Sequence, residues 1–302
     1  MEWLNPYHLQ VASFMLINAI LGVSIYVTLS TGQLSLGNAG FMSIGAYTAA
    51  LLSTQHQLPI PVGILAGSLL AGAAGILVGI PSLRLSGVYL AIATLGFGEV
   101  LRAVLINWES LTGGAVGIAA IPQMGRVILA GARDRGFTPE SLGLQSNQFI
   151  SLTVFLILLA GTLLTVAFFL RLSRSRVGRA YAAIRLDESA AAAAGIPITY
   201  YKVLAFSQGA LLSGFAGALF AHSTSFVSPG DFTYHRAVEI LVFAVFGAAF
   251  LTVVPEALRA ISEYRYILYG ILLVLMMVFR PQGVIDPALL RRFRRSGKGT
   301  PA

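Results

Sequence analysis

The sequence predicts an all-α membrane protein: a polytopic transmembrane helix bundle of about eight spans, with broken or re-entrant helices. The first observation is composition. Of the 302 residues 56% are hydrophobic and only 11% are charged, whereas a soluble domain carries about 25% charged residues. The second is that apolar runs recur along the chain, most of them near the about 20 residues that cross a bilayer. Such a chain cannot bury all of its apolar surface as a soluble protein does, which predicts that it lies in a membrane.

The expected spans follow from the apolar runs. The first six are Val11–Leu29, Ala39–Ser53, Ile60–Ile80, Gly87–Ile106, Phe149–Leu170 and Val203–His222. The second of these is short and interrupted by glycine. The last two runs are Val238–Val254 and Tyr266–Phe279. We therefore expect one transmembrane domain over residues 1–290 and a basic, disordered tail over 291–302.

The orientation follows from a basic, alanine-rich segment, residues 171–202. Its basic residues are Arg171, Arg174, Arg176, Arg179, Arg185 and Lys202. Loops rich in Lys and Arg stay in the cytoplasm, so counting backwards places Arg84 inside and both the 107–147 connector and the N-terminus outside. The N-terminal stretch has no basic region, which predicts a retained first span. Counting forwards leaves the basic tail outside, so one crossing is missing or miscounted.

A glycine-rich polar segment joins the first two spans. Its notable residues are Gly32, Gln33, Ser35, Gly37, Asn38, Gly40 and Gly45. Broken backbone at membrane depth is tolerated where it is buried in protein or lines a wet cavity. One interpretation is therefore a broken helix lining a translocation path. The other is a helix cap with small residues that allow close helix packing. The residues alone leave both open.

The 171–202 segment also carries helix signals. Asp187 can cap a short helix through the following alanines, and Gly195 can end it. Gly178 is expected to separate this helix from an earlier basic one. Two short helices would then present Arg179, Arg185, Asp187 and Glu188 at a cytoplasmic surface. The alternative is a retention signal whose helicity is incidental.

Other charged and polar residues give weaker signals. Glu99 and Arg102 share one helical face, and we favour a structural ion pair over a proton path. The glycines of 111–117 lack the Lys and Ser or Thr of a P-loop. The chain has no cysteine and its four histidines are scattered, so we expect no metal site, no cofactor and no catalytic residues. Positive-inside topology explains the net charge of +8 better than nucleic-acid binding does.

Five stretches occur in an order that resembles one family. They are GQLSLGNAGFMSIGAYTAALL, LRLSGVYLAIATLGFGEVLR, LTGG, GRAYAAIRLDESAAAAAGI and LYGILLVLMMVFRPQGVI. Together they resemble the LivM-type permeases of ABC importers for branched-chain amino acids, over about residues 30 to 285. The resemblance implies a non-enzymatic permease subunit of the bacterial inner membrane. Its partners would be a second, homologous permease, two ATP-binding subunits that hydrolyse ATP, and a periplasmic substrate-binding protein.

The resemblance also implies roles for residues. The 171–202 segment is similar to the EAA loop, which couples a permease to its ATPase. The implied coupling residues are Arg176, Gly178, Arg179, Arg185, Asp187, Glu188 and Gly195. Ser189 stands where the general pattern has glutamate. The family's glycine-rich stretch after Phe246-Gly247 is missing here, which would explain the crossing count, so residues 238–256 should differ most from relatives.

Two other functions remain open at this stage. The same machinery could import urea, short amides or a sugar, because the separate binding protein largely selects the substrate. A self-sufficient, ion-coupled secondary transporter is the other, although it would need coupling-ion sites within the spans.

Overall fold

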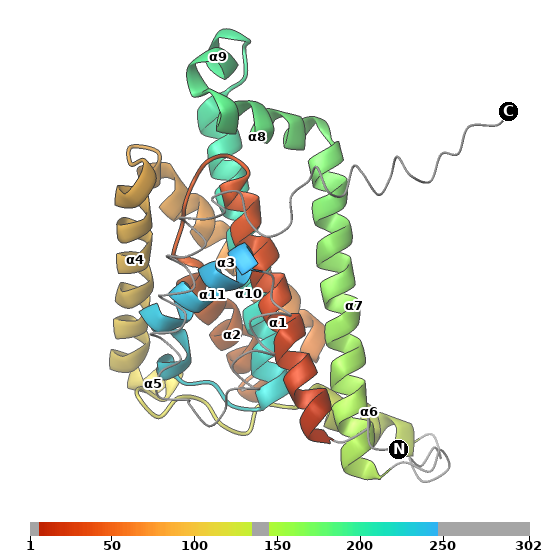
Figure 1. Cartoon of the computed structure of the whole chain (residues 1–302). Helices are drawn as coiled ribbons and strands as arrows, with labels where there is room; N and C mark the ends of the chain where they lie inside the picture. The colour runs from red at the N-terminus through yellow and green to blue at the C-terminus, as the bar shows by residue number, and fades with distance from the viewer. Residues whose placement is uncertain (1–5, 135–144, 247–302) are drawn as a thin grey trace, which may run out of the picture.

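The computed structural model describes residues 6–134 and 145–246, and every named element in those ranges is a helix (Figure 1). Ile118 and Val227 form one isolated antiparallel bridge. The elements are α1 Pro6–Leu29, α2 Asn38–Thr54, α3 Ile60–Ser82, α4 Gly87–Asn107, α5 Glu109–Thr112, α6 Met124–Arg133, α7 Ser146–Arg174, α8 Arg176–Leu186, α9 Glu188–Ala193, α10 Ile198–Thr224, the 3-10 helix η3 Pro229–Phe232 and α11 Tyr234–Phe246.

Five helices in the described ranges, α1, α3, α4, α7 and α10, are long and apolar enough to cross a membrane. The first six predicted spans are all helices, with bounds close to those expected. α7 has 29 residues, about 43 Å at 1.5 Å per residue, so its last turn can extend beyond a hydrocarbon core of about 30 Å. α11 covers only the start of Val238–Val254. Tyr266–Phe279 and the 291–302 tail lie outside the described residues, as does the point of the expected deletion.

The two ends of the bundle differ in what they carry. α8, α9 and the α3–α4 turn lie at one end, whereas α5, α6 and the start of α1 lie at the other (Figure 1). Successive connections therefore lie at opposite ends of the bundle, as the charge-based orientation requires for the first six spans. We refer below to the α8–α9 end as the inner end and to the other as the outer end.

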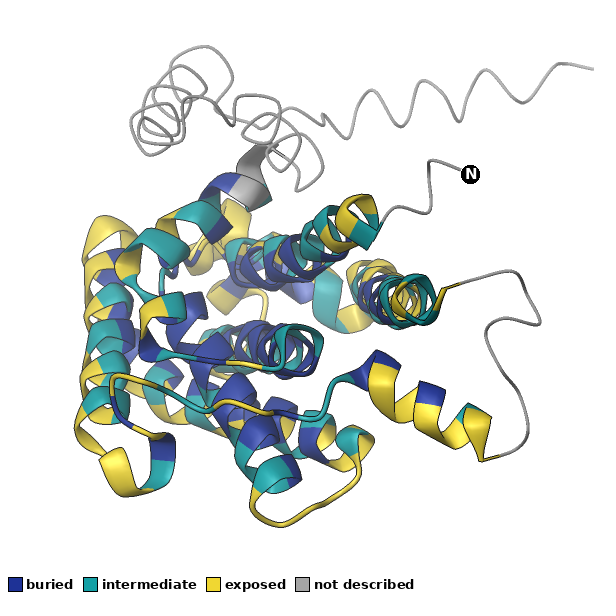
Figure 2. Ribbon diagram, turned by 90° about the horizontal axis from the view of Figure 1, so that it is seen from below, coloured by how far each residue is buried: buried dark blue, intermediate teal, exposed yellow. Residues whose placement is uncertain are grey.

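α10 lies at the centre, in backbone contact with α2 and α3 through glycines. A Cβ atom on Gly45 would overlap the carbonyl of Gly214, and one on Gly67 would lie 2.6 Å from the Gly45 carbonyl oxygen. Gly217 meets Met42 of α2 in the same way. In lipid, where apolar surface gives little drive for association, small residues permit this close packing. Buried residues accordingly gather in the middle of the bundle and exposed ones at its periphery (Figure 2).

The outer helices expose large apolar side chains. Leu69 on α3, Val100 on α4 and Leu164 on α7 are each more than 60% exposed. Such side chains suit contact with lipid tails, which are as apolar as leucine. The periphery therefore fits a bilayer environment.

Candidate functional site

The segment between α1 and α2 enters the bundle as extended chain. α1 ends at Leu29, Gly32 takes a left-handed φ of +79°, and residues 33–36 are not helical before α2 begins at Asn38. α2 has 17 residues, about 26 Å, which is short for a hydrocarbon core of about 30 Å. The structure confirms that the second predicted span is short. The predicted interruption by glycine is wrong, because α2 is continuous through Gly40 and Gly45 and the irregular backbone lies before it.

The extended backbone is bonded inside the protein. The Leu36 amide donates to the Thr94 hydroxyl of α4 at 2.9 Å, and the Gly37 amide donates to the Ser35 hydroxyl at 3.2 Å. Ser35 and Thr94 are 0% and 1% exposed. Irregular backbone at membrane depth is stable only with such partners, so Thr94 holds the segment in place.

Thr94→Val should therefore destabilise the protein although it preserves the side chain's shape. The valine leaves the Leu36 amide without its acceptor, and an unsatisfied buried donor costs about 1–3 kcal/mol. We expect a lower midpoint of thermal unfolding in detergent, with Thr94→Ser close to the parent protein because it keeps the hydroxyl. Equal midpoints for the valine and serine variants would contradict this role.

A buried polar cluster lies just below the segment. The Asn38 side-chain amide donates to Ser24 of α1 at 2.8 Å and to Ser213 of α10 at 3.0 Å. The Ser213 hydroxyl donates in turn to Ser24 at 3.0 Å. All three residues are at most 2% exposed. Asn38 thus joins α1, α2 and α10.

The glycines predicted to line a path have packing contacts in this structure. Built Cβ atoms on Gly37 and Gly40 would meet α4 at Thr94 and Gly98, with nearest distances of 3.3 and 3.0 Å. Gly45 of α2 is in close contact with both α3 and α10. The close-packing interpretation therefore describes their contacts here, and the path-lining role stays a prediction.

The inner end carries a hairpin of two short helices, α8 and α9, which we call the α8–α9 hairpin (residues 176–193). One face of α8 packs on the bundle, with Ala180, Tyr181 and Ile184 buried. The Tyr181 hydroxyl donates to the side-chain oxygen of Gln208 on α10 at 3.0 Å. Burial, helped by the neighbouring tyrosines 200 and 201, raises the pKa of Tyr181 above its ordinary value. α8 is thus held on the bundle by buried side chains and by the Tyr181–Gln208 hydrogen bond.

The predicted helix break at Gly178 is wrong. α7 runs to Arg174, and Ser175 caps α8 by accepting a hydrogen bond from the Gly178 amide at 3.2 Å. Gly178 lies inside the first turn of α8, where a Cβ atom would overlap the Leu172 carbonyl and lie 2.7 Å from the Ser173 Cα. The glycine permits the close approach of α8 to the last turn of α7, and the helix break lies at Ser175.

The predicted signals around α9 are confirmed. Asp187 Oδ1 accepts hydrogen bonds from the amides of Ser189 and Ala190 at 2.8 and 3.0 Å. Gly195 has a φ of +80°, and the amides of Gly195 and Ile196 donate to Ala192 and Ala191 at 2.9 and 3.0 Å. This pair of bonds is a Schellman motif, which left-handed glycine completes.

The exposed face of the hairpin is mixed in character. Leu186 is 87% exposed, and Arg176, Arg179 and Arg185 of the same helix are also exposed. Glu188 forms an ion pair with Lys202 of α10 at 2.5 Å, in which Glu188 is the more exposed partner. Sequence reasoning missed Leu186 and the Lys202 contact. An apolar residue at the end of a basic helix was the available signal for Leu186.

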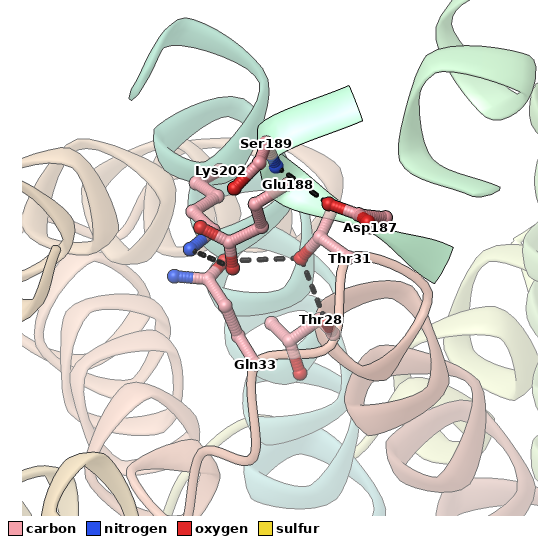
Figure 3. A network of polar contacts seen from close by, with 7 residues as sticks. All are labelled: Thr28, Thr31, Gln33, Asp187, Glu188, Ser189 and Lys202. Carbon is pink, nitrogen blue, oxygen red and sulfur yellow. Dashed lines mark hydrogen bonds and ion pairs between the residues drawn. The ribbon is translucent and has the colours of Figure 1, made fainter. Parts of the chain in front are cut away.

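The two predicted sites meet at the inner end (Figure 3). A built Cβ on Gly32 would lie 3.9 Å from the Cα of Arg185. Thr31 donates to the Gln33 side-chain oxygen at 3.1 Å and to the Thr28 carbonyl at 2.9 Å. Thr31 and Gln33 are 1% and 5% exposed, and they lie beside Asp187 and Glu188 of the hairpin (Figure 3). The start of the broken span is therefore in contact with the α8–α9 hairpin.

Glu99 and Arg102 form the expected ion pair, 2.8 Å between Oε2 and Nε. Glu99 Oε1 also accepts the Tyr234 amide at 2.9 Å. Tyr234 begins α11, so the carboxylate lies at that helix's N-terminus, where negative charge is favourable. These contacts favour the structural role over a proton path.

A helical bundle with an apolar periphery, buried irregular backbone before a short helix and a polar hairpin at one end define a multi-span α-helical membrane protein. The chain matches the family described as "Branched-chain amino acid transport system / permease component" over residues 7–279. It therefore belongs to that family.

Individual proteins similar to this chain belong to the same family. The chain is 40% identical over 294 residues to the high-affinity branched-chain amino acid transport system permease protein LivM of Escherichia coli, covering 91% of this chain and 69% of that one. The Salmonella typhimurium LivM is 38% identical with the same coverage. A probable LivM of Methanocaldococcus jannaschii is 22% identical, over 74% of this chain and 67% of that one. No solved structure matches this chain.

Proposed function

We propose that this chain is the permease subunit of an ABC importer for branched-chain or other neutral amino acids, in a bacterial inner membrane. The observation that carries the proposal is the α8–α9 hairpin, whose one face is packed on the bundle and whose other face is exposed. Family membership supports it, and the relatives' names specify branched-chain amino acid transport. Two ATP-binding subunits, a second permease and a substrate-binding protein would complete the machine.

The proposed contact with the ATP-binding subunit centres on Leu186. An exposed apolar side chain at the end of a helix that also exposes cations suits a groove with an apolar floor and acidic rim, because complementary charge orients the partner. Arg179 and Arg185 would supply the rim contacts. Glu188 and Asp187 hold α9 in place through the bonds to Lys202 and to the α9 amides. These bonds fix the geometry of α9, so its exposed neighbours would move together.

The proposed coupling runs from the hairpin to the broken span. ATP binding closes the ATPases, and a hairpin held by them must move with them relative to the rest of the bundle. Only a difference in contacts between two states can shift their populations. The Gly32–Arg185 contact would change first, and the extended segment leads from it to Asn38. Residues 32–40, which lie before the glycine-packed contact of Gly45 with α3 and α10, would then line this subunit's half of the path in one of the states.

Leu186→Asp tests the proposal with little risk to folding, because the side chain is almost fully exposed. We expect the variant to lose co-purification with its ATP-binding subunit. ATP-driven uptake of labelled leucine should fall about ten-fold or more, since the variant would place an unpaired carboxylate in an apolar contact, which is costly.

Val116→Asp is the matched control, because Val116 is 78% exposed at the outer end. It should leave ATPase association unchanged. Full association and uptake in the Leu186→Asp variant would remove the proposed docking contact. Absence of any ATPase association in the intact chain, or uptake that follows an ion gradient instead of ATP, would overturn the function itself.

A further inference from the structure

α6 is a short helix that lies against the start of α7 at the outer end (Figure 1). Met124, Gly125 and Leu129 are its buried residues. A Cβ atom on Gly125 would lie 2.6 Å from the Ile150 carbonyl oxygen of α7, so the two backbones are in close contact. Seen from below, α6 projects sideways from the bundle with mostly exposed residues (Figure 2).

The remaining residues of α6 form two further faces. Successive residues turn by about 100° around a helix. Val127 and Ile128 fall on an apolar side and are 49% and 44% exposed. Arg126 and Arg133, seven residues apart, fall together on the opposite side and are exposed. α6 thus has a bundle-facing side, an apolar exposed side and a basic side.

The basic side is unexpected on the basis of topology. Arg126 and Arg133 lie at the end opposite the α8–α9 hairpin, where the positive-inside rule disfavours them. Within the part of the chain that the structure describes, neither is in an ion pair, although Arg133 donates to the Ser146 hydroxyl at 3.2 Å. Asp134 follows at the end of the helix and is exposed. Among the described residues, Ser146 is thus the one side chain that forms a hydrogen bond with either cation.

The position of α6 along α7 indicates what these two arginines could bind. It packs beside the first turns of α7, which is one of the helices long enough to span, and so lies near the level where a bilayer's hydrocarbon meets its headgroups. A helix with an apolar edge and Lys or Arg on its polar face lies in that plane, with its apolar side among the acyl chains. Arginine binds phosphate oxygens bidentately.

We propose that α6 is an interfacial helix of the outer leaflet that binds anionic phospholipids. Val127 and Ile128 enter the acyl-chain boundary, and Arg126 and Arg133 hold the headgroup phosphates. The helix fixes the outer end of α7 at the membrane surface. This interaction surface is distinct from the α8–α9 hairpin, and it stands whether or not the chain couples to an ATPase.

The absence of cysteine makes the depth measurable. Ile128→Cys and Ala130→Cys, about 160° apart around α6 and both exposed, would each carry one spin label in nanodiscs of phosphatidylcholine and phosphatidylglycerol. We expect the label at 128 to be relaxed mainly by oxygen, which concentrates in lipid. The label at 130 should be relaxed mainly by a water-soluble nickel chelate. The pair shares one helix, so a folding defect would alter both labels alike.

Lipid selectivity is tested with spin-labelled lipids around the full chain. Arg126→Gln/Arg133→Gln should lower the preference for phosphatidylglycerol over phosphatidylcholine by about five-fold or more, and Arg126→Lys/Arg133→Lys should largely keep it. Equal nickel access at 128 and 130, or an unchanged preference in the glutamine variant, would overturn the proposal. A water-exposed label at 128 that is immobilised only when the substrate-binding protein is added would do so too, and would assign the face to protein docking.

Discussion

Gly45→Ala is expected to prevent the bundle from closing. The added methyl group would overlap the Gly214 carbonyl of α10, and the Gly45 carbonyl is itself 2.6 Å from the position of a Cβ atom on Gly67. Both neighbours are helical backbone, which cannot rotate away as a side chain can. Overpacking typically costs 1–3 kcal/mol, and here we expect at least about 3 kcal/mol, since three helices must separate together. The measurement is the yield and thermal unfolding midpoint of the folded protein by size-exclusion chromatography.

Gly96→Ala is the control for that change. Gly96 also lies inside a helix, α4, but a Cβ atom there would meet nothing within 4 Å. Both substitutions gain the same helix propensity, about 1 kcal/mol, so the difference between them isolates the contact. If the two variants unfold at the same temperature, α2, α3 and α10 are not in backbone contact. A folded Gly45→Ala protein that fails only in transport would instead favour the path-lining role.

Arg236→Met is expected to be the second most damaging change. Arg236 of α11 pairs with Glu239 at 3.2 Å and donates to the Asn18 side-chain oxygen of α1 at 2.9 Å. Its side chain is 18% exposed and that of Glu239 is 13% exposed. Removing one partner of a mostly buried pair leaves an uncompensated charge, which costs about 3–5 kcal/mol. Thermal unfolding of the purified protein measures the loss.

The double variant Arg236→Met/Glu239→Met distinguishes the charge effect from lost packing. Removing both charges is often neutral or favourable, although Asn18 still loses a donor worth about 1 kcal/mol. We therefore expect the double variant to recover most of the stability that the single variant loses. A double variant that is less stable than Arg236→Met would show that side-chain packing, and not the orphaned charge, holds α11 on α1.

Much of the fold could be predicted because its signals are local. A membrane span can be predicted from the length of its apolar run. Asp187 and Gly195 mark the ends of α9 because capping involves residues only two to four positions away. α5 and α6 were missed because they are short helices inside a polar connector. Gly178 was misread because a glycine in this position serves a contact with Leu172 and Ser173 that only the three-dimensional turn creates.

The separate parts of the candidate site could be predicted from the sequence, but the contacts between those parts could not. Ser213 lies 175 residues from Asn38 in the sequence, so no periodic pattern connects them. The contact of Gly32 with Arg185 joins two motifs that were read as separate sites. Side-chain partners such as Lys202 for Glu188 depend on how α9 returns to α10. Those pairings follow from the packing of whole helices, which single-sequence patterns do not fix.

The glycine contacts among α2, α3 and α10 set a limit on how this protein can work. Helices that touch backbone to backbone cannot slide or tilt past one another without losing the fit, so the three must travel as one body through any transport cycle. Opening and closing would then fall to α1, α4, α7 and α11 around it, and distance changes measured between labels on α2 and α3 should stay near zero throughout turnover.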